Sequence, residues 1–382
     1  MTRAVLRRLH RWIGLLLVLP LIIQAVTGLI MAADPFVAAI RDVPSSNGWL
    51  VEPDDLRGVD VAAVLAAARA AVPGDVMRGE VVPVRWRVEP GAIAAVDFAA
   101  PGRQQVVAEV GVDALFTTVA WVRRDPGVFY RWVHSVHETL LMGAQGRRLI
   151  GAIGIGLLLL GLFGIPLWWP RRGRWLAGVT VSRGASGWRL QRELHGAAGF
   201  WMLVVLLVQS VSGVAMAFPQ TARAIVGLPD MARRGAHVGG DVRVDPVRSI
   251  VAGVASAQAA LPEAVLLDLR LPAVPGRPMM AVLLPRGDWQ GSPPAIVSMN
   301  RASGRVLSVQ DPRASSLGVS ALNWLRAWHE GGAGGPAGRV LLCVFALVLV
   351  LLPVTGLGMW VLRWRQRRRA ATSRSRPVEE GV

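Results

Sequence analysis

Four long apolar runs limit what this chain can fold into more than any other feature of its sequence. They span about Trp12–Ala33, Leu149–Trp169, Gly196–Phe218 and Arg339–Leu362. About 20 apolar residues in a helix cross a bilayer core of about 30 Å, so each run is long enough to cross once. The hydrophobic share of 53% and the mean hydropathy of +0.43 fit a chain that lies largely in a membrane. The sequence therefore predicts an integral membrane α-helical protein with four transmembrane helices.

Clusters of arginine flank these runs and predict their orientation. The formal net charge is +17, and a strongly basic chain can be a nucleic-acid binder. Here the densest clusters stand at the ends of the apolar runs, so we predict no nucleic-acid partner. Because basic residues concentrate in the cytoplasmic flanks of membrane helices, both termini are expected in the cytoplasm. The clusters are Arg3, Arg7, Arg8 and Arg11; Arg171, Arg172 and Arg174; and Arg363, Arg365, Arg367, Arg368 and Arg369.

The first and third apolar runs share a pattern of polar residues. A histidine stands just before each run, and a glutamine follows 14 residues after that histidine. Matches between apolar residues mean little in membrane helices, but polar residues at the same spacing are rarely matched by chance. We therefore infer a repeat. The matched pairs are His10 with His195, Gln24 with Gln209, Thr27 with Ser212, and Gly28 with Gly213.

The second and fourth runs match each other as well. Each follows a His-Glu pair and a glycine-containing turn, and each ends in tryptophan and arginine. The matched pairs are Trp132 with Trp324, His137 with His329, Glu138 with Glu330, Gly164 with Gly356, and Trp168 with Trp360. Both copies start and end on the same side. We therefore expect two parallel helix-pair repeats, related by a pseudo-two-fold axis along the membrane normal.

The long segment inside each copy is predicted to form a small α+β domain outside the membrane. Each has one helix-like stretch, Val61–Val72 or Pro246–Ala260, followed by stretches of alternating polarity that predict strands. The strand-like stretches are Arg85–Val88, Ala94–Phe98 and Gln105–Val110 in the first segment, and Val265–Leu271, Met279–Leu284, Ala295–Asn300 and Arg305–Val309 in the second.

These features divide the chain into eight parts. The helices are predicted at 148–169 and 195–218, with a first helix inside 1–33 and a fourth at 338–362. The outer domains, each ending in its histidine segment, are 34–147 and 219–337; the cytoplasmic loop is 170–194; and the basic cytoplasmic tail is 363–382.

The repeated histidines are the candidate cofactor ligands. The repeat pairs His10 with His195 on the inner side and His137 with His329 on the outer side, and polar groups near a bundle interior are usually functional. Two histidines suit zinc poorly, because zinc takes four protein ligands or three plus water, although the glutamates after the outer pair could add oxygen ligands. Cys343 is the only cysteine, which excludes disulfides and iron–sulfur clusters. Haem needs only two axial ligands, so the pairs predict two haem b groups, one on each side.

Several neighbouring residues have more than one interpretation. His134 lies one turn before His137 and could replace it as a ligand, bind a haem propionate or contact substrate. Gln24 and Gln209 could form an interhelical hydrogen bond or a polar contact to the outer haem. His237 is expected to be simply solvated. The arginines that could receive propionates or an anionic ligand are Arg123, Arg124, Arg131 and Arg326.

In combination, these motifs resemble the PepSY-associated transmembrane-helix family, whose members are often described as iron-regulated membrane proteins. The resemblance covers nearly the whole chain and includes LHRWIGLLLVLPLIIQAVTGLIM from Leu9 and WHEGGAGG from Trp328. It implies that the outer domains are PepSY-like. The first of them departs from the family pattern, since Val110–Ala114 stands where a D-x-x-T-G turn would be expected.

Within that family the chain looks closest to dihaem ferric-siderophore reductases of the ferrioxamine type. The resemblance implies an oxidoreductase of the bacterial inner membrane, with His10, His195, His137 and His329 as haem ligands. It would pass electrons from a cytoplasmic or quinol donor to a hydroxamate, ferrioxamine-like Fe(III)-siderophore in the periplasm and release Fe(II). The chain lacks a G-x-G-x-x-G fingerprint, so the donor is expected to be a separate molecule.

Two functions without redox chemistry stay open. One is a PepSY-type sensor that binds a ligand or a peptidase through the outer domains. The other is a siderophore permease, although four helices without an intramembrane carboxylate offer little for an ion path.

Overall fold

The chain forms two compact units. The computed structural model describes residues 2–40, 59–76, 80–89, 92–103, 105–124, 127–170, 173–228, 245–271, 277–288 and 292–374. The helical unit comprises Met1–Ala33, Val133–Pro219 and Arg339–Val382. The sheet unit comprises Asp34–Trp132 and Gln220–Gly338.

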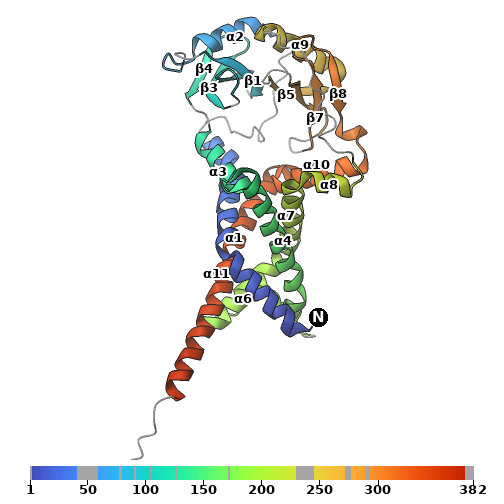
Figure 1. Cartoon of the computed structure of the whole chain (residues 1–382). Coiled ribbons are helices and arrows are strands. Elements are labelled where there is room, and N and C mark those ends of the chain that lie inside the picture. The colour runs from blue at the N-terminus through green and yellow to red at the C-terminus, as the bar shows by residue number, and fades with distance from the viewer. Residues whose placement is uncertain are drawn as a thin grey trace, which may run out of the picture. The chain divides into compact units, whose positions relative to one another are not determined.

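Apolar helices build the helical unit (Figure 1). Its long helices are α1 (Arg3–Ile40), α4 (Gly143–Trp168) and α11 (Gly335–Arg374). The segments long and apolar enough to cross a membrane are Arg3–Asp34, Gly143–Trp168 and Gly332–Arg369. The helices α6 (Gly187–Trp201) and α7 (Leu203–Ala217) meet the same criterion only together. Within the described residues the chain thus has three candidate membrane spans, or four if α6 and α7 are one span.

The third predicted helix starts earlier than expected and is bent. We expected one span over 195–218 that begins at His195, but α6 already begins at Gly187 and meets α7 at an angle of 67°. The break is at Met202, whose φ of −101° and ψ of 6° leave helical geometry. The hydrogen bonds from the Met202 N–H to Ala198 and from the Leu206 N–H to Met202 persist, so the chain turns within one residue. His195 therefore lies inside α6 rather than at a helix start.

Glycines allow α4 and α7 to pack closely. A Cβ on Gly154 would lie 2.9 Å from Val214, and one on Gly161 would lie 2.8 Å from Leu206. Small residues of this kind let membrane helices approach each other and gain van der Waals contact. A buried apolar cluster joins α1, α4, α7 and α11 in the same unit. Its members are Leu17, Leu21, Ala25, Ile153, Leu157, Leu206, Phe345 and Leu349.

One antiparallel sheet runs through the sheet unit. Its eight described strands have the order β4-β3-β2-β1-β5-β6-β7-β8. The strands are β1 (Val82–Glu89), β2 (Ile93–Ala99), β3 (Val106–Asp113), β4 (Val119–Arg124), β5 (Ala264–Arg270), β6 (Met279–Pro285), β7 (Ala295–Met299) and β8 (Val306–Gln310). Strands β1 and β5 pair at the centre, with Trp86 opposite Leu269. This pair joins the first four strands to the last four.

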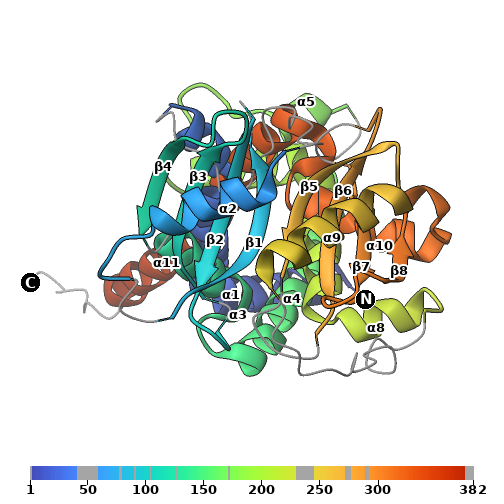
Figure 2. The ribbon, with the colours of Figure 1, turned by 90° about the horizontal axis from the view of Figure 1, so that it is seen from above.

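Two helices cover one face of this sheet. Figure 2 shows α2 (Val61–Ala70) and α9 (Pro246–Ala260) side by side across it. The carboxylates of Asp60 and Asp245 cap them by accepting N–H bonds in the first turn, which stabilises a helix start. Residues of both helices and of both halves of the sheet share one apolar core, centred on side chains such as Trp86.

Further described helices are α3 (Val128–Thr139), α5 (Trp175–Val179), α8 (Pro219–Ile225) and α10 (Leu317–His329).

A charged pair on the opposite face of the sheet links the two halves. Arg85 on β1 donates two hydrogen bonds of 2.8 Å to the carboxylate of Asp268 on β5, and Arg270 donates a third. Burial alone would raise the pKa of Asp268, but the two guanidinium groups outweigh it and hold the pKa of this carboxyl below its usual range.

The sheet unit differs from expectation in two respects. The predicted helices and seven of the strands lie where the sequence placed them, within a few residues. Strand β4 was not predicted, because most of its residues are exposed and its sequence VAWVRR does not alternate clearly. We also expected two separate α+β domains, whereas the two halves share one sheet and one core. The β1–β5 pairing between distant segments has no local signal in the sequence.

Candidate cofactor site

His10 and His195 lie side by side in the helical unit. His10 lies near the start of α1, and His195 lies in α6. Their ring centroids are 6.1 Å apart and their planes are inclined by 84°. Both side chains are half-buried. The structure therefore brings together the two residues that the sequence paired on this side.

Contacts from α11 hold His195. Its Nδ1 lies 3.0 Å from the carbonyl oxygen of Leu352 and 3.0 Å from Oγ1 of Thr355. A carbonyl oxygen can only accept, so Nδ1 carries the hydrogen and donates it. In the neutral ring Nε2 then keeps its lone pair, and this is the atom that can bind a metal.

His10 has different surroundings on α4. A Cβ on Gly164 would lie 3.8 Å from its Cε1, so α4 passes close to the ring. Its Nδ1 is buried and forms no hydrogen bond of good geometry within the described residues, although the ring faces the backbone of Leu160, the repeat counterpart of Leu352. In the sequence repeat, Phe163 stands where Thr355 stands in the other copy. A phenyl ring offers no acceptor for an imidazole N–H, so the two histidines of this pair are held unequally.

His137, near the end of α3, is held by α1. Its Nδ1 lies 2.9 Å from Oγ1 of Thr27, and the same hydroxyl lies 2.7 Å from the carbonyl oxygen of Ile23. A Cβ on Gly28 would lie 3.4 Å from Cε1 of the imidazole. A Thr-Gly pair therefore contacts His137, just as Thr355-Gly356 contacts His195.

A strained turn follows His137. Leu140 and Leu141 have φ values of 49° and 61°, a conformation that costs a non-glycine residue about 1–2 kcal/mol. The turn brings the carbonyl oxygen of Thr139 so close to α4 that a Cβ on Gly146 would lie 1.6 Å from it. Strain of this kind tends to occur at functional sites. Here it fixes the end of α3, and with it His137, against the start of α4.

His134 lies apart from these contacts. Its side chain is 51% exposed, and its Nδ1 is 3.9 Å from the carboxylate of Glu138. Glu138 forms an ion pair with Arg147. The structure thus places His137, rather than His134, against α1.

The other predicted site residues are spread over the chain. His329 ends α10 in the sheet unit, so its pairing with His137 rests on the sequence repeat. His237 lies outside the described residues. The amide Nε2 of Gln24, one turn before Thr27, is buried without a hydrogen-bond partner in the described part of the chain. The arginines predicted to receive anions include three in ion pairs, Arg123 with Glu109, Arg124 with Asp75, and Arg326 with Glu330.

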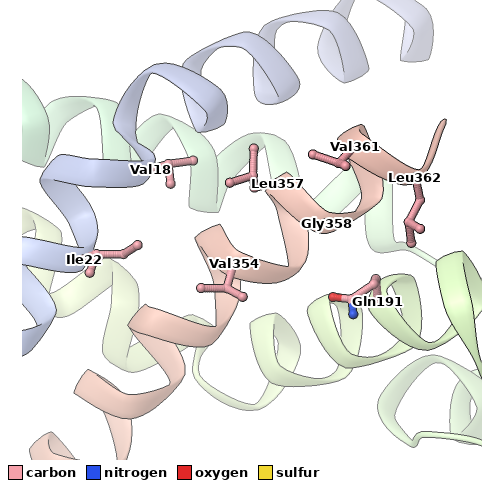
Figure 3. A pocket seen from close by; sticks show the side chains of 8 residues that line it. All are labelled: Val18, Ile22, Gln191, Val354, Leu357, Gly358, Val361 and Leu362. Atoms are coloured by element: carbon pink, nitrogen blue, oxygen red, sulfur yellow. The ribbon is translucent and has the colours of Figure 1, made fainter. Parts of the chain in front are cut away.

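An apolar hollow opens between α1, α6 and α11, and neither histidine is among the residues that line it. It has a volume of about 420 Å³, within the range of about 300–1,000 Å³ typical of ligand pockets. Gln191 on α6, one turn before His195, is its polar residue (Figure 3). The apolar lining consists of Val18 and Ile22 on α1 and Val354, Leu357, Gly358, Val361 and Leu362 on α11. The hollow thus lies between the helices that carry or contact the two histidines.

Comparison with known families decides the family of the chain. Residues 7–363 match the family described as PepSY-associated TM region. The chain belongs to this family. With its long apolar helices, it is therefore a membrane-spanning protein. No curated protein sequence matches it.

In this PepSY-associated protein, the two rings of the inner histidine pair are separated by the distance expected of two imidazoles that bind one metal ion. Metal–imidazole bonds are about 2.0 Å long, which puts the centroids of two imidazoles on opposite sides of one metal about 6 Å apart. The observed separation is 6.1 Å. No group of three or more His, Cys, Asp or Glu side chains gathers in the described parts of the chain. Haem iron can take two axial histidine ligands, so the spacing of this pair fits a haem.

Sequence reasoning missed the groups that orient the histidines. Thr355, the Leu352 carbonyl and Gln191 were not predicted, although each lies at the inner site. The repeat did not reveal Thr355, because its counterpart is a phenylalanine. A detectable signal was the Thr-Gly dipeptide, which occurs in both the first and the fourth apolar runs.

Proposed function

We propose that this protein is a dihaem b-type reductase of the bacterial inner membrane. It would take electrons from a cytoplasmic or quinol donor and reduce the Fe(III) of a hydroxamate, ferrioxamine-like siderophore in the periplasm. The observation that carries this proposal is the separation of 6.1 Å between the rings of His10 and His195, which come from two different helices of a membrane unit.

The ligand set follows from the repeat and from the contacts around each ring. His10 and His195 would hold the inner haem, and Nε2 of His195 is available because its Nδ1 donates to α11. His137 and His329 would hold the outer haem. The buried amide of Gln24, one turn from the residue that contacts His137, supports a polar group of a cofactor on that side.

The chemistry of such a site is one-electron transfer. Haem with two histidine ligands supplies a one-electron carrier without an open position for O₂. The protein's part is to fix the two rings of each pair, and apolar side chains of the same helices line a hollow of about 420 Å³ in the helical unit. One electron per iron converts Fe³⁺ into Fe²⁺. The hard oxygen ligands of a hydroxamate suit Fe²⁺ less well, so the iron is released.

The proposed topology has four membrane crossings, two parallel helix-pair repeats and both termini in the cytoplasm. The start of α1 and the end of α11 lie at the same end of the helical unit (Figure 1). Arg3 also donates a hydrogen bond of 2.8 Å to the carbonyl of Pro166 near the end of α4. Basic residues gather at this end, which supports a cytoplasmic location for it.

Anaerobic reoxidation of the reduced protein tests this function. The purified full-length protein is reduced with dithionite, excess reductant is removed, and ferrioxamine is added with a ferrous chelator present. We expect the reduced b-haem bands to disappear while one Fe(II) is captured per electron. The matched control is His10→Ala, which should transfer fewer electrons because the inner haem is lost.

Two results would contradict the proposal. One is a haem-free protein that still supports iron uptake, which would favour the permease. The other is a haem protein whose reduced bands are stable to ferrioxamine and to other ferric hydroxamates. Loss of function on deletion of the sheet unit, with no effect of the histidine substitutions, would favour the ligand or peptidase sensor.

A further inference from the structure

The same dipeptide contacts two of the proposed haem ligands. Thr27-Gly28 on α1 contacts His137 on α3, and Thr355-Gly356 on α11 contacts His195 on α6. The contacts are alike in detail. In each case the threonine Oγ1 meets Nδ1, and the next residue, a glycine, meets Cε1 of the same ring. The two contacts involve four different helices, so the likeness does not come from one local structure.

The threonine hydroxyls are set to accept rather than donate. Oγ1 of Thr27 lies 2.7 Å from the carbonyl oxygen of Ile23, and Oγ1 of Thr355 lies 2.8 Å from that of Leu351. A hydroxyl has one hydrogen, and these carbonyls of its own helix are the nearest acceptors. Its lone pairs then point to the imidazole. Both threonines are buried, with 7% and 1% of their surface exposed, so water does not compete for the hydroxyl.

Each contact favours one tautomer of the histidine. At His195 the carbonyl of Leu352 can only accept, so Nδ1 must carry the hydrogen. At His137 the hydroxyl of Thr27 accepts from Nδ1 at 2.9 Å. Both neutral rings then keep the lone pair on Nε2. A metal-bound histidine usually donates its other N–H to such a partner, which fixes the ring and increases the basicity of the ligand.

The glycines leave room for the rings. A Cβ at Gly28 would lie 3.4 Å from Cε1 of His137, and one at Gly356 would lie 3.6 Å from Cε1 of His195. Both distances are already at van der Waals contact. Any side chain larger than a methyl group would push the imidazole away from its threonine.

We infer that Thr27-Gly28 and Thr355-Gly356 are positioning residues that fix the tautomer and orientation of His137 and His195, so that Nε2 of each ring faces the iron. This inference rests on the proposed function, because it assigns a purpose to the two rings as haem ligands. It also predicts an inequality at the inner haem. His195 has such a pair, whereas at His10 the sequence repeat places Phe163 before Gly164, and in the described residues the ring faces the Leu160 backbone without a hydroxyl partner.

Thr27→Val in the full-length protein tests the outer contact. Loss of a partner that orients a metal-bound histidine costs about 10–100-fold in metal affinity, so haem retention at one of the two sites should fall at least about 10-fold. The low-spin EPR signature and the midpoint potential of that haem should change as well. Thr27→Ser keeps the hydroxyl and should restore all three properties.

Ser210→Ala is the matched control. The hydroxyl of Ser210 is buried to the same degree and donates to the carbonyl of Leu206 at 2.7 Å, but it contacts no histidine in the described residues. This variant should keep both haems with wild-type spectra. At the inner site, Thr355→Val leaves the Leu352 carbonyl as an acceptor, so the loss of haem should stay below 10-fold, and Thr355→Ser should have no effect.

The histidine tautomers distinguish failure of this inference from failure of the proposed function. They are read by ¹⁵N NMR of full-length protein labelled at histidine and produced in cells that cannot make haem. We expect Nδ1–H signals for His137 and His195, and loss of the first in Thr27→Val. Nε2–H tautomers for both rings would overturn the positioning role. So would a Thr27→Val protein with two haems and unchanged EPR and potentials, and the reductase would then stand. A haem-free wild-type protein would overturn the proposed function, and the tautomers would still decide whether the Thr-Gly pairs fix these rings.

Discussion

The N-terminal and C-terminal halves of the chain agree closely in the sheet unit and differ in the helical unit. Strands β1–β4 and β5–β8 each form an antiparallel run with one helix beside it, and the two runs meet at the β1–β5 pair. The glycines that follow the two His-Glu pairs also behave alike. A Cβ on Gly146 would strike the carbonyl of Thr139, and one on Gly338 would strike that of Gly331. The strand order and the close contact in the turn after the His-Glu pair are therefore alike in the two halves.

The differences gather around the inner histidines. Helix α1 continues for 38 residues through His10, whereas α6 and α7, which carry the matching sequence, meet at 67°. His195 donates to the Leu352 carbonyl and lies beside the Thr355 hydroxyl, while His10 faces the Leu160 backbone without a hydrogen bond of good geometry in the described residues. His10 and His195 are the same residue type, but their surroundings differ. The two sides of the proposed inner haem are therefore chemically different, even though the repeat supplies the same residue twice.

Removal of the ligands should have the largest effect. His10→Ala and His195→Ala should each reduce the haem content from two to one per chain, because a two-ligand site cannot hold its haem without either ring. His137→Ala should remove the other haem. His134→Ala is the matched control, since this side chain is half exposed and lies apart from α1, and it should keep both. Haem extraction with quantification against protein checks these counts. Loss of a haem in His134→Ala would transfer the ligand role to that residue.

The turn that follows each His-Glu pair provides the next test, through the stability of the protein. Gly146→Ala places a methyl group 1.6 Å from a backbone oxygen, and Gly338→Ala places one at 2.8 Å. The first should destabilise the protein by about 3 kcal/mol and the second by less. Thermal melting in detergent measures both. Gly14→Ala, where the nearest atom is 3.8 Å away, is the control and should be neutral or slightly stabilising. Equal melting of all three variants would contradict the close contact.

Removal of the ion pair between Arg85 and Asp268, which joins the halves of the sheet, should destabilise the protein less, and the loss should depend on pH. Asp268→Asn should cost about 2 kcal/mol, less than for a fully buried pair because the Arg85 side chain is 34% exposed. The pKa of Asp268 is lower in the folded protein than in the unfolded chain. Its contribution is therefore complete above the unfolded pKa of about 3.9 and is lost as the pH falls through the lower folded value.

Melting of the sheet unit as a function of pH checks this prediction. The difference in melting temperature between wild type and Asp268→Asn should be constant at neutral pH and should shrink below about pH 4. A difference that grows in acid would show that the carboxylate is not the group responsible.

The addition of a hydroxyl beside His10, to match Thr355 beside His195, should change stability and midpoint potential least. Phe163→Thr places a hydroxyl where Thr355 stands in the other copy, and a hydrogen bond to Nδ1 of His10 should contribute about 1 kcal/mol. The midpoint potential of the inner haem should fall, because a ligand with an accepted N–H is more basic and stabilises the ferric state. Phe163→Val removes the ring without adding an acceptor and is the control. The same potential in both variants would show that the hydroxyl does not reach the imidazole.

Local sequence patterns predicted the elements but not how they associate. The apolar runs predicted α1, α4 and α11, and alternation predicted most strands, because periodicity reports directly on burial. The β1–β5 pairing and the bend at Met202 depend on contacts between distant segments and on one residue's backbone angles. Neither leaves a local signal in the sequence.

At the inner histidine site, too, the sequence predicted the residues that repeat but not the contacts that depend on packing. The repeat paired His10 with His195 because both stand at the same spacing from a glutamine, and the structure brings the rings together. The Leu352 carbonyl could not be predicted, since every residue has a carbonyl and only the packing of α6 on α11 selects this one. Thr355 was hidden because Phe163 breaks the match between the copies.

The most direct test of the central claim is the haem content of the purified wild-type protein, measured as the pyridine haemochrome against total protein. We predict b-type haem, low-spin by its spectrum, at two per chain. A colourless protein that retains its activity would contradict the dihaem proposal. So would a wild-type protein with only one haem per chain, if that haem persists when both His10 and His195 are replaced by alanine and disappears in His137→Ala.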